Sequence, residues 1–254
     1  MIKKIINYDR PRILVYQMGK VGSSSIFYSL KKKRLRGVYH VHRLNIENIK
    51  KIRHTNTHPL FKEPTKTGEE LCPIFSVKPN KIKIITMTRD PIARNISAFF
   101  ENLNIFEYHD SYQEKVSIDG LNNLFLDNYS HDIPLNWFDI EIKNVLEIDV
   151  FKHYFCKSKG HSIINNKNIE LLIIKCEIDN EIKTQVIKRF LNLRKFKLIN
   201  ANIGTQKKYS NYYQKFKDSI KLPREYINKM YDSKYSQHFY SGEEIVNFKK
   251  KWSL

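Results

Sequence analysis

A chain of 254 residues that is 41% hydrophobic and 13% aromatic can bury one substantial core, so disordered, collagenous and disulfide-built classes are excluded. The net charge of +19 gathers at the two ends, with +12 over residues 1–53, −4 over 54–180 and +11 over 181–254. Basic ends of this kind fit a nucleic-acid binder, an enzyme of charged nucleotides or anionic glycans, or a solvated lysine-rich surface.

Targeting and redox signals in the sequence favour the cytoplasm. Residues 1–11 begin with lysines, but their apolar run stops within two residues, which argues against a signal peptide. No run approaches the roughly 18 apolar residues that a membrane-spanning helix needs. The cysteines Cys72, Cys156 and Cys176 lie far apart without a Cys-x-x-Cys pair, as in a reduced protein. We expect a cytoplasmic protein that at most contacts the inner face of a membrane.

Predicted strands and helices alternate through the first 104 residues. The expected strands are 12–17, 37–42 and 82–88, and the expected helices are 23–34 and 91–104. This alternation predicts an α/β fold with a central parallel sheet flanked by helices. Residues 54–80, rich in Thr, Pro and Lys, have no clean period and are predicted to form a long surface loop.

The second half is predicted to add one strand and several helices. A buried strand is expected at 170–176 and an amphipathic helix at 179–193. The part from 200 to 254 is basic, aromatic and helical: Pro223 opens one helix, and Ser241 begins a capping-box sequence that starts the last. No repeat or Gly/Ser linker is visible, so the whole chain is predicted to be a single domain.

Residues 18–25 (Met-Gly-Lys-Val-Gly-Ser-Ser-Ser) follow the first strand and lead into a helix. The glycines let the backbone approach a ligand, the helix N-terminus favours negative charge, and Lys20 adds a full positive charge. A Walker A loop would place the lysine directly after its second glycine, whereas Lys20 precedes Gly22. The sequence therefore predicts an anion cradle of another kind.

A second motif follows the strand at 82–88. Arg89 stands where strand meets helix, at the carboxyl edge of the sheet where ligands bind in such folds, and Ser97 follows eight residues later. Asp90 before Pro91 has the pattern of a helix start rather than of a magnesium ligand.

The two motifs together resemble the superfamily of sulfotransferases that use PAPS (3′-phosphoadenosine 5′-phosphosulfate). The resemblance implies a P-loop-like sulfotransferase fold, PAPS as donor and PAP, its desulfated form, as product. It also assigns the 3′-phosphate to Arg89 and Ser97, and a C-terminal nucleotide contact to Lys208 and Tyr209. The 5′-phosphosulfate would be held by Lys20, Val21, Gly22, Ser23, Ser24 and Ser25.

The later part of the chain resembles a bacterial family of capsular polysaccharide synthesis proteins. The likeness lies in residues 137–141 (Trp-Phe-Asp-Ile-Glu), in 148–150 (Ile-Asp-Val) and in the tail from Lys208 to Ser241. It implies a carbohydrate or lipid-linked glycan as acceptor, with no specific nucleic acid as partner.

Sulfuryl transfer needs a base for the acceptor hydroxyl and positive charge for the leaving phosphate. Alternation along the second strand puts His40 and His42 on one face, and His42 lies nearer the carboxyl end. His42 is therefore the first choice for the base and His40 the second. Lys20 fits the leaving group, and Arg89, Arg94 and the basic ends supply further charge, so no metal is expected.

Two other classes remain open on the sequence. A P-loop-like kinase or nucleotide hydrolase would require magnesium and ATP. A non-enzymatic module that binds nucleic acid or another polyanion would use the aromatic tail, with Tyr209, Tyr212 and Tyr213 stacking on bases.

Overall fold

The computed structural model describes residues 12–55, 81–103, 117–200 and 209–253, and these build one five-stranded sheet. The order across the sheet is β2-β1-β3-β5-β4. The strands are β1 (Ile13–Tyr16), β2 (Val38–Val41), β3 (Ile82–Thr88), β4 (His161–Asn166) and β5 (Ile169–Lys175). β1, β2, β3 and β5 are mutually parallel, whereas β4 pairs antiparallel with β5. The predicted α/β fold is thus confirmed as a mostly parallel central sheet, and β4 adds an antiparallel edge strand that the sequence did not predict.

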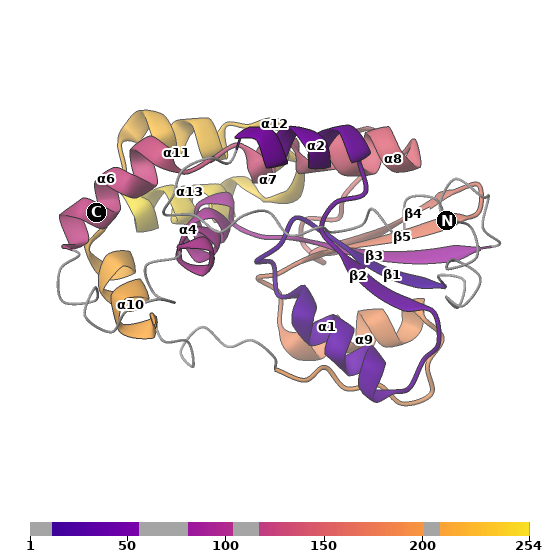
Figure 1. The fold of residues 1–254 in the computed structure, drawn as a ribbon. Helices are drawn as coiled ribbons and strands as arrows, with labels where there is room; N and C mark the ends of the chain where they lie inside the picture. The colour runs from indigo at the N-terminus through magenta and orange to yellow at the C-terminus, as the bar shows by residue number, and fades with distance from the viewer. Residues whose placement is uncertain (1–11, 56–80, 104–116, 201–208, 254) are drawn as a thin grey trace.

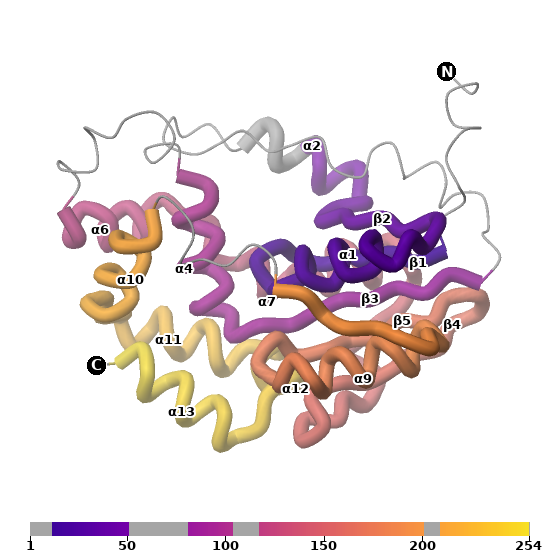
Figure 2. Tube along the Cα trace, turned by 90° about the horizontal axis from the view of Figure 1, so that it is seen from below, coloured from indigo at the N-terminus to yellow at the C-terminus, as the bar shows by residue number. Residues whose placement is uncertain are grey.

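Helices cover both faces of the sheet (Figure 1). One face carries α1 (Ser23–Lys32) and α9 (Asn180–Phe190), which lie in front of the strands when the molecule is seen from below (Figure 2). The helices on the opposite side include α2 (Ile46–Thr55), α7 (Ile133–Trp137), α8 (Asn144–Leu146) and α12 (Lys234–Phe239). A π-helix, η3 (Phe138–Lys143), joins α7 to α8, and a 3-10 turn, η4 (Val150–Lys152), follows.

The remaining helices extend the molecule beyond the carboxyl ends of the parallel strands. They are α4 (Pro91–Asn102), α6 (Ile118–Asn128), α10 (Ser210–Ser219), α11 (Arg224–Tyr231) and α13 (Gly242–Trp252). Fully buried rings of Phe99, Phe100, Phe125 and Phe216 join α4, α6 and α10 in one aromatic cluster. Within the described ranges, no helix is both long and apolar enough to cross a membrane.

Most expected elements lie within two residues of the observed ones. The strand predicted at 82–88 coincides with β3, because its mostly β-branched and buried residues continue to the turn at Arg89. The helix predicted at 179–193 ends earlier, at Phe190. Ser241 and Glu244 form the predicted capping box at the start of α13, with both reciprocal bonds present. Of the predicted loop 54–80, residues 56–80 lie outside the described part of the chain.

Candidate functional site

The turn after β1 presents the open N-terminus of a helix. Gly19, Lys20 and Gly22 all have left-handed backbone conformations, with φ of 81°, 62° and 85°. Gly22 is the residue before α1, and the helix has neither a side-chain cap nor an acidic residue in its first turn. The unpaired amides of a first helical turn attract anions. The turn therefore has the open helix N-terminus that the predicted cradle requires, although Val21 is fully buried and offers a ligand only its backbone.

Arg94 stabilises this turn through hydrogen bonds to its backbone carbonyls. Its Nη2 donates to the Met18 carbonyl at 2.9 Å and its Nε to the Gly19 carbonyl at 3.3 Å. Its Nη1 donates to Tyr129 Oη at 3.2 Å and to Asn95 Oδ1 at 3.0 Å. The side chain is buried, with 4% exposed. Since all three guanidinium nitrogens bond within the protein, Arg94 positions the loop, in contrast to its expected role as a further cation for the ligand.

Arg89 lies beside the same turn, and part of its guanidinium has no partner among the described residues. Its Nη1 donates to the Lys20 carbonyl at 2.6 Å. Its other two guanidinium nitrogens have no hydrogen-bond partner among the described residues. Its backbone is fixed by the hydroxyl of Tyr235, a fully buried side chain of α12. Arg89 thus has a rigid backbone and a guanidinium that can receive an anion.

Glu101 connects the loop with the start of α10. Its Oε2 lies 3.3 Å from Lys20 Nζ and accepts a hydrogen bond from Tyr209 Oη at 2.5 Å. Burial raises the pKa of Tyr209, and the hydrogen bond and charge of Glu101 raise it further. Tyr209 is therefore brought to Lys20 through Glu101, while Lys208 lies outside the described residues.

Ser97 lies on the face of α4 that meets the loop. It stands three residues after Arg94 and four before Glu101, spacings that place side chains on one side of a helix. Its hydroxyl has no hydrogen-bond partner among the described residues. Ser97 therefore stands on the side of α4 that carries Arg94 and Glu101, the residues that contact the loop.

His40 and His42 lie next to the loop, joined by Gln17. The side-chain nitrogen of Gln17, Nε2, lies 3.1 Å from His40 Nε2, 2.9 Å from His42 Nδ1 and 2.6 Å from Ser23 Oγ. The two imidazoles meet edge to face, with centroids 4.9 Å apart. Burial lowers the pKa of each to about 4; His42 further lowers that of His40, and the hydrogen bond to the Gln17 carbonyl opposes the shift in His42. Both rings are therefore neutral at pH 7.

The two histidines differ in which nitrogen is engaged. His40 Nε2 lies 2.9 Å from Ser23 Oγ, and Phe27 stacks on the ring. His42 Nδ1 lies 3.0 Å from the Gln17 carbonyl, and its Nε2 has no partner among the described residues. With its proton on Nδ1, His42 donates to the Gln17 carbonyl and cannot also accept from the Gln17 side-chain amide, whose two hydrogens then go to Ser23 Oγ and His40 Nε2. This tautomer leaves the lone pair of His42 on Nε2. His42 is thus the better placed of the two to accept a proton.

Residues from η3 and α7 support the strand end that carries His42. Trp137 Nε1 donates to the His42 carbonyl at 3.0 Å. The carboxylate of Glu141, which is fully buried, accepts from Tyr16 Oη at 2.6 Å. It also accepts from the amides of Leu44 and Asn45 and from the side chain of Asn48. These buried bonds fix the chain immediately after His42.

Asp90 has the structural role that its sequence context predicts. Its Oδ1 accepts from the amides of Ile92 and Ala93 and from Tyr231 Oη at 2.7 Å. Its Oδ2 accepts from Trp252 Nε1 at 3.1 Å. Both carboxylate oxygens are thereby used in capping α4 and anchoring the C-terminal helices. Among the described residues, no group of three or more His, Cys, Asp and Glu is arranged to hold a metal ion.

The aromatic residues considered for base stacking pack inward. Tyr213 meets Phe100 edge-on at 5.4 Å, and Tyr209 lies 5.8 Å from the same ring. Together with Tyr212 they are partly buried against the core. This arrangement favours their structural interpretation over a stacking platform.

Several residues of the site were not singled out from the sequence. Gln17 and Glu101 carry only a weak signal, a polar side chain directly after an apolar strand and an acid late in a helix. Trp137 and Glu141 stand within the segment that carries the family likeness, but nothing in the sequence links them to His42.

Comparison with known families connects this site to one of them. Searches among curated proteins and among solved structures found no match. A family model named NKWYS, described as "Putative capsular polysaccharide synthesis protein", matches residues 110–241, which is more than half of the chain. The matched range contains Trp137, Glu141 and Tyr235, which hold His42 and Arg89 in place. The chain therefore belongs to the NKWYS family of capsular polysaccharide synthesis proteins.

Proposed function

We propose that this protein is a PAPS-dependent sulfotransferase with a P-loop-like sulfotransferase fold. It transfers a sulfuryl group to a hydroxyl of a carbohydrate, either a capsular or surface polysaccharide or its lipid-linked precursor in the cytoplasm. The observation that carries the proposal is the meeting of Lys20, Arg89 and the uncapped N-terminus of α1 at one sheet edge. The family description supports the carbohydrate acceptor.

The residues of the loop fit a donor with two anionic ends. The first amides of α1 and the ammonium of Lys20, a residue of the turn that leads into α1, would hold the phosphosulfate, because both carry positive charge. The unpartnered nitrogens of Arg89 and the Ser97 hydroxyl would hold the 3′-phosphate. Gly22 leaves room for a ligand to approach the start of α1, because it is exposed and has no side chain. Its left-handed φ disfavours any other residue at this position.

The reaction would be an in-line displacement at sulfur. The acceptor oxygen forms a bond to sulfur, the bond from sulfur to the 5′-phosphate oxygen breaks, and its electron pair stays on that phosphate. His42 Nε2 takes the hydroxyl proton, while Lys20 and the α1 amides stabilise the charge that develops on the leaving phosphate. The products are the sulfated glycan, PAP and a protonated His42, which then releases its proton to solvent.

Charge around His42 fits a base that works when the donor is bound. Beyond burial, Arg43, Arg94 and Lys20 lower the pKa of His42. An anionic donor bound at Lys20 offsets part of this positive charge and so raises the pKa toward neutrality. The base is thereby strengthened in the complex, where a proton has to be accepted.

A thermal-shift titration with PAP, beside one with magnesium-ATP, tests the proposal. We expect PAP to stabilise the wild type by several degrees at saturation and Arg89→Ala to remove that shift. Arg189→Ala, an exposed arginine on α9, is the matched control and should keep it. Stabilisation by magnesium-ATP without any response to PAP would instead support the kinase or hydrolase class.

Transfer itself is tested with labelled PAPS and candidate glycans. His42→Ala should bind PAP like the wild type and lose transfer, because only the proton acceptor is removed. Full transfer activity in this variant would contradict the assignment of His42.

A further inference from the structure

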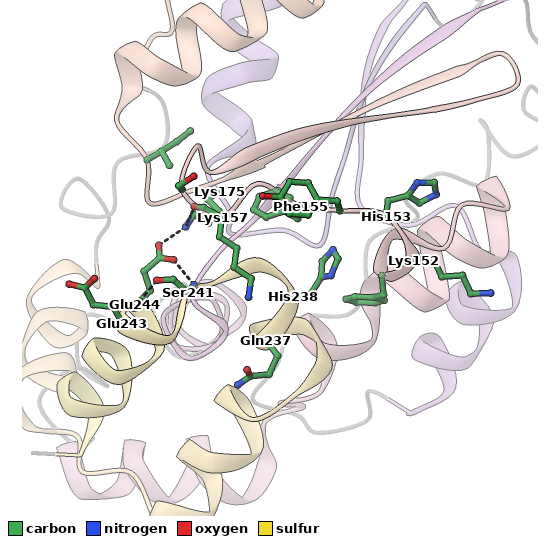
Figure 3. A pocket seen from close by; sticks show the side chains of 14 residues that line it. Lys152, His153, Phe155, Lys157, Lys175, Gln237, His238, Ser241, Glu243 and Glu244 are labelled. Carbon is green, nitrogen blue, oxygen red and sulfur yellow. Dashed lines mark hydrogen bonds and ion pairs between the residues drawn. The ribbon is translucent and has the colours of Figure 1, made fainter.

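A hollow separate from the loop at Lys20 opens on the side of the sheet opposite α1. Its volume is about 920 Å³, and its walls come from the segment 151–158, the end of β5, α12 and the start of α13 (Figure 3). All of the lining residues except Glu243 and Glu244 fall within the range matched by the family model. The hollow is thus mainly a feature of the family-matched part of the chain.

The hollow is separate from the loop at Lys20 although both adjoin the end of β5. Lys175, the last residue of that strand, lines the hollow. The next residue, Cys176, faces the loop, since its Sγ lies 3.6 Å from where a Cβ on Gly22 would stand. Successive side chains of an extended chain point to opposite faces. The two sites therefore lie on opposite sides of one strand end.

Polar groups without protein partners line the hollow. His238 Nε2 is buried and has no hydrogen-bond partner in the described part of the chain. A buried polar atom left in this state costs free energy that a ligand hydrogen bond recovers. The ammonium of Lys157 forms no ion pair with any described residue, and Figure 3 shows this side chain extending toward His238 and Gln237.

The charge left over in the hollow is positive. Lys175, only 3% exposed in its side chain, is neutralised by Glu244 at 2.5 Å, and Glu244 is further used in the capping box of α13. Of the other charged side chains in the lining, Lys157 extends into the hollow, whereas Lys152 and Glu243 point away from it (Figure 3). An anionic group is therefore favoured over a neutral one.

Aromatic rings complete the hollow. Tyr154 is 83% exposed, which is unusual for a large ring, and Phe151 lines the wall near His238 with ring centroids 5.2 Å apart. A sugar ring has an apolar C–H face that packs on such rings and hydroxyls that take hydrogen bonds from the polar groups between them.

We propose that this hollow binds a carboxylate-bearing sugar of the acceptor chain, at a distance from the hydroxyl that is sulfated. Lys157 pairs with the carboxylate, His238 hydrogen-bonds to the sugar, and Tyr154 stacks on its ring. The inference rests on the glycan acceptor of the proposed function and deepens it, because it gives the acceptor an acidic residue and a second point of attachment.

Calorimetric titration with trigalacturonic acid, compared with neutral maltotriose, tests the site. We expect the acidic trisaccharide to bind and maltotriose to bind at least tenfold more weakly. Lys157→Ala and Tyr154→Ala should each weaken binding of the acidic sugar about tenfold. Lys159→Ala, an exposed lysine two residues further along and outside the lining, should bind like the wild type.

Two results would overturn the inference: no binding of trigalacturonic acid by the wild type, or equal binding by Lys157→Ala and Lys159→Ala. Melting curves of each variant confirm that the fold is kept. The PAP thermal shift is measured on the same variants and should stay unchanged. Loss of the PAP response with retained, Lys157-dependent sugar binding would refute the proposed donor and leave this site standing.

Discussion

The hydroxyl of Tyr235 makes hydrogen bonds to both sides of Arg89: it accepts from the Arg89 amide at 3.0 Å and donates to the Arg89 carbonyl at 2.9 Å. The two residues stand 146 positions apart in the sequence. One side chain of α12 thus fixes the backbone from which the Arg89 guanidinium reaches the loop. The C-terminal helices therefore help to determine where an anion at Arg89 would lie.

Replacing Tyr235 by Phe should weaken the site through Arg89. Both Arg89 backbone groups lose a buried partner, which costs about 1–3 kcal/mol of unfolding free energy. The guanidinium then starts from a less fixed backbone, and we expect PAP affinity to fall roughly fivefold to tenfold, an effect of about 1–1.4 kcal/mol. Calorimetric titration and urea unfolding measure the two effects. Tyr213→Phe, on the partly buried side of α10, is the control and should change neither, because its hydroxyl has no hydrogen-bond partner among the described residues.

Neutralising Glu101 should strengthen donor binding. Its carboxylate lies 3.3 Å from Lys20 Nζ and offsets the charge that would meet the phosphosulfate. Glu101→Gln removes that negative charge and keeps an acceptor for Tyr209, so we expect PAP affinity to rise several-fold, most clearly at low salt. Glu170→Gln breaks a comparable pair with Lys83 at the far end of the strands and serves as the control. Unchanged PAP affinity in Glu101→Gln would contradict the assignment of Lys20 to the donor site.

Replacing Glu141 by Gln should destabilise the chain around His42. The buried carboxylate accepts from Tyr16, Leu44, Asn45 and Asn48, and an amide cannot accept at both of its ends. We expect a loss of about 2–4 kcal/mol of unfolding free energy. Glu147→Gln, in an exposed pair with Lys167, should cost less than about 0.5 kcal/mol. Denaturant unfolding of both variants measures the difference.

The stability of the fold should fall in mild acid because of the two buried histidines. Each has a pKa of about 4 in the folded protein against 6.5 in the unfolded chain. Between these values the unfolded chain binds more protons. The unfolding free energy is therefore full above pH 6.5 and declines as the pH falls toward 4, by on the order of 2 kcal/mol per histidine.

Urea unfolding at pH 7 and pH 4.5 measures this decline. His42→Gln should show a smaller difference between the two pH values than the wild type. His153→Gln, at an exposed histidine after η4, should show the full difference. Identical pH profiles in all three proteins would mean that His42 is not buried in its neutral form.

The sequence predicted the elements whose signals are local. β3 is a run of mostly β-branched residues, Asp90 and Pro91 mark the start of α4, and Ser241 with Glu244 marks the start of α13. In each case a few neighbouring residues carry both the signal and the structure, so no distant contact is needed to recognise them.

Elements that depend on distant partners were not predicted. β4 is polar at both ends and forms an edge strand because β5 offers a free side, which no local pattern reveals. The bond from Trp137 to His42 spans 95 positions, and that from Glu141 to Leu44 spans 97. Sequence spacing could place the histidines on one strand face, but it could not show what holds that strand end in position.

The contacts of Trp137 and Glu141 also bear on how this protein can be recombined with its relatives. A chimera that takes residues 110–241 from a relative would replace Trp137 and its neighbours but keep the original strand end with His42. The two packing surfaces would then not be complementary. Residues 38–48 would have to travel with the exchanged segment for the joint to fit. The unit that can be exchanged is thus discontinuous along the chain, because a boundary at residue 110 separates His42 from the residues that hold it in place.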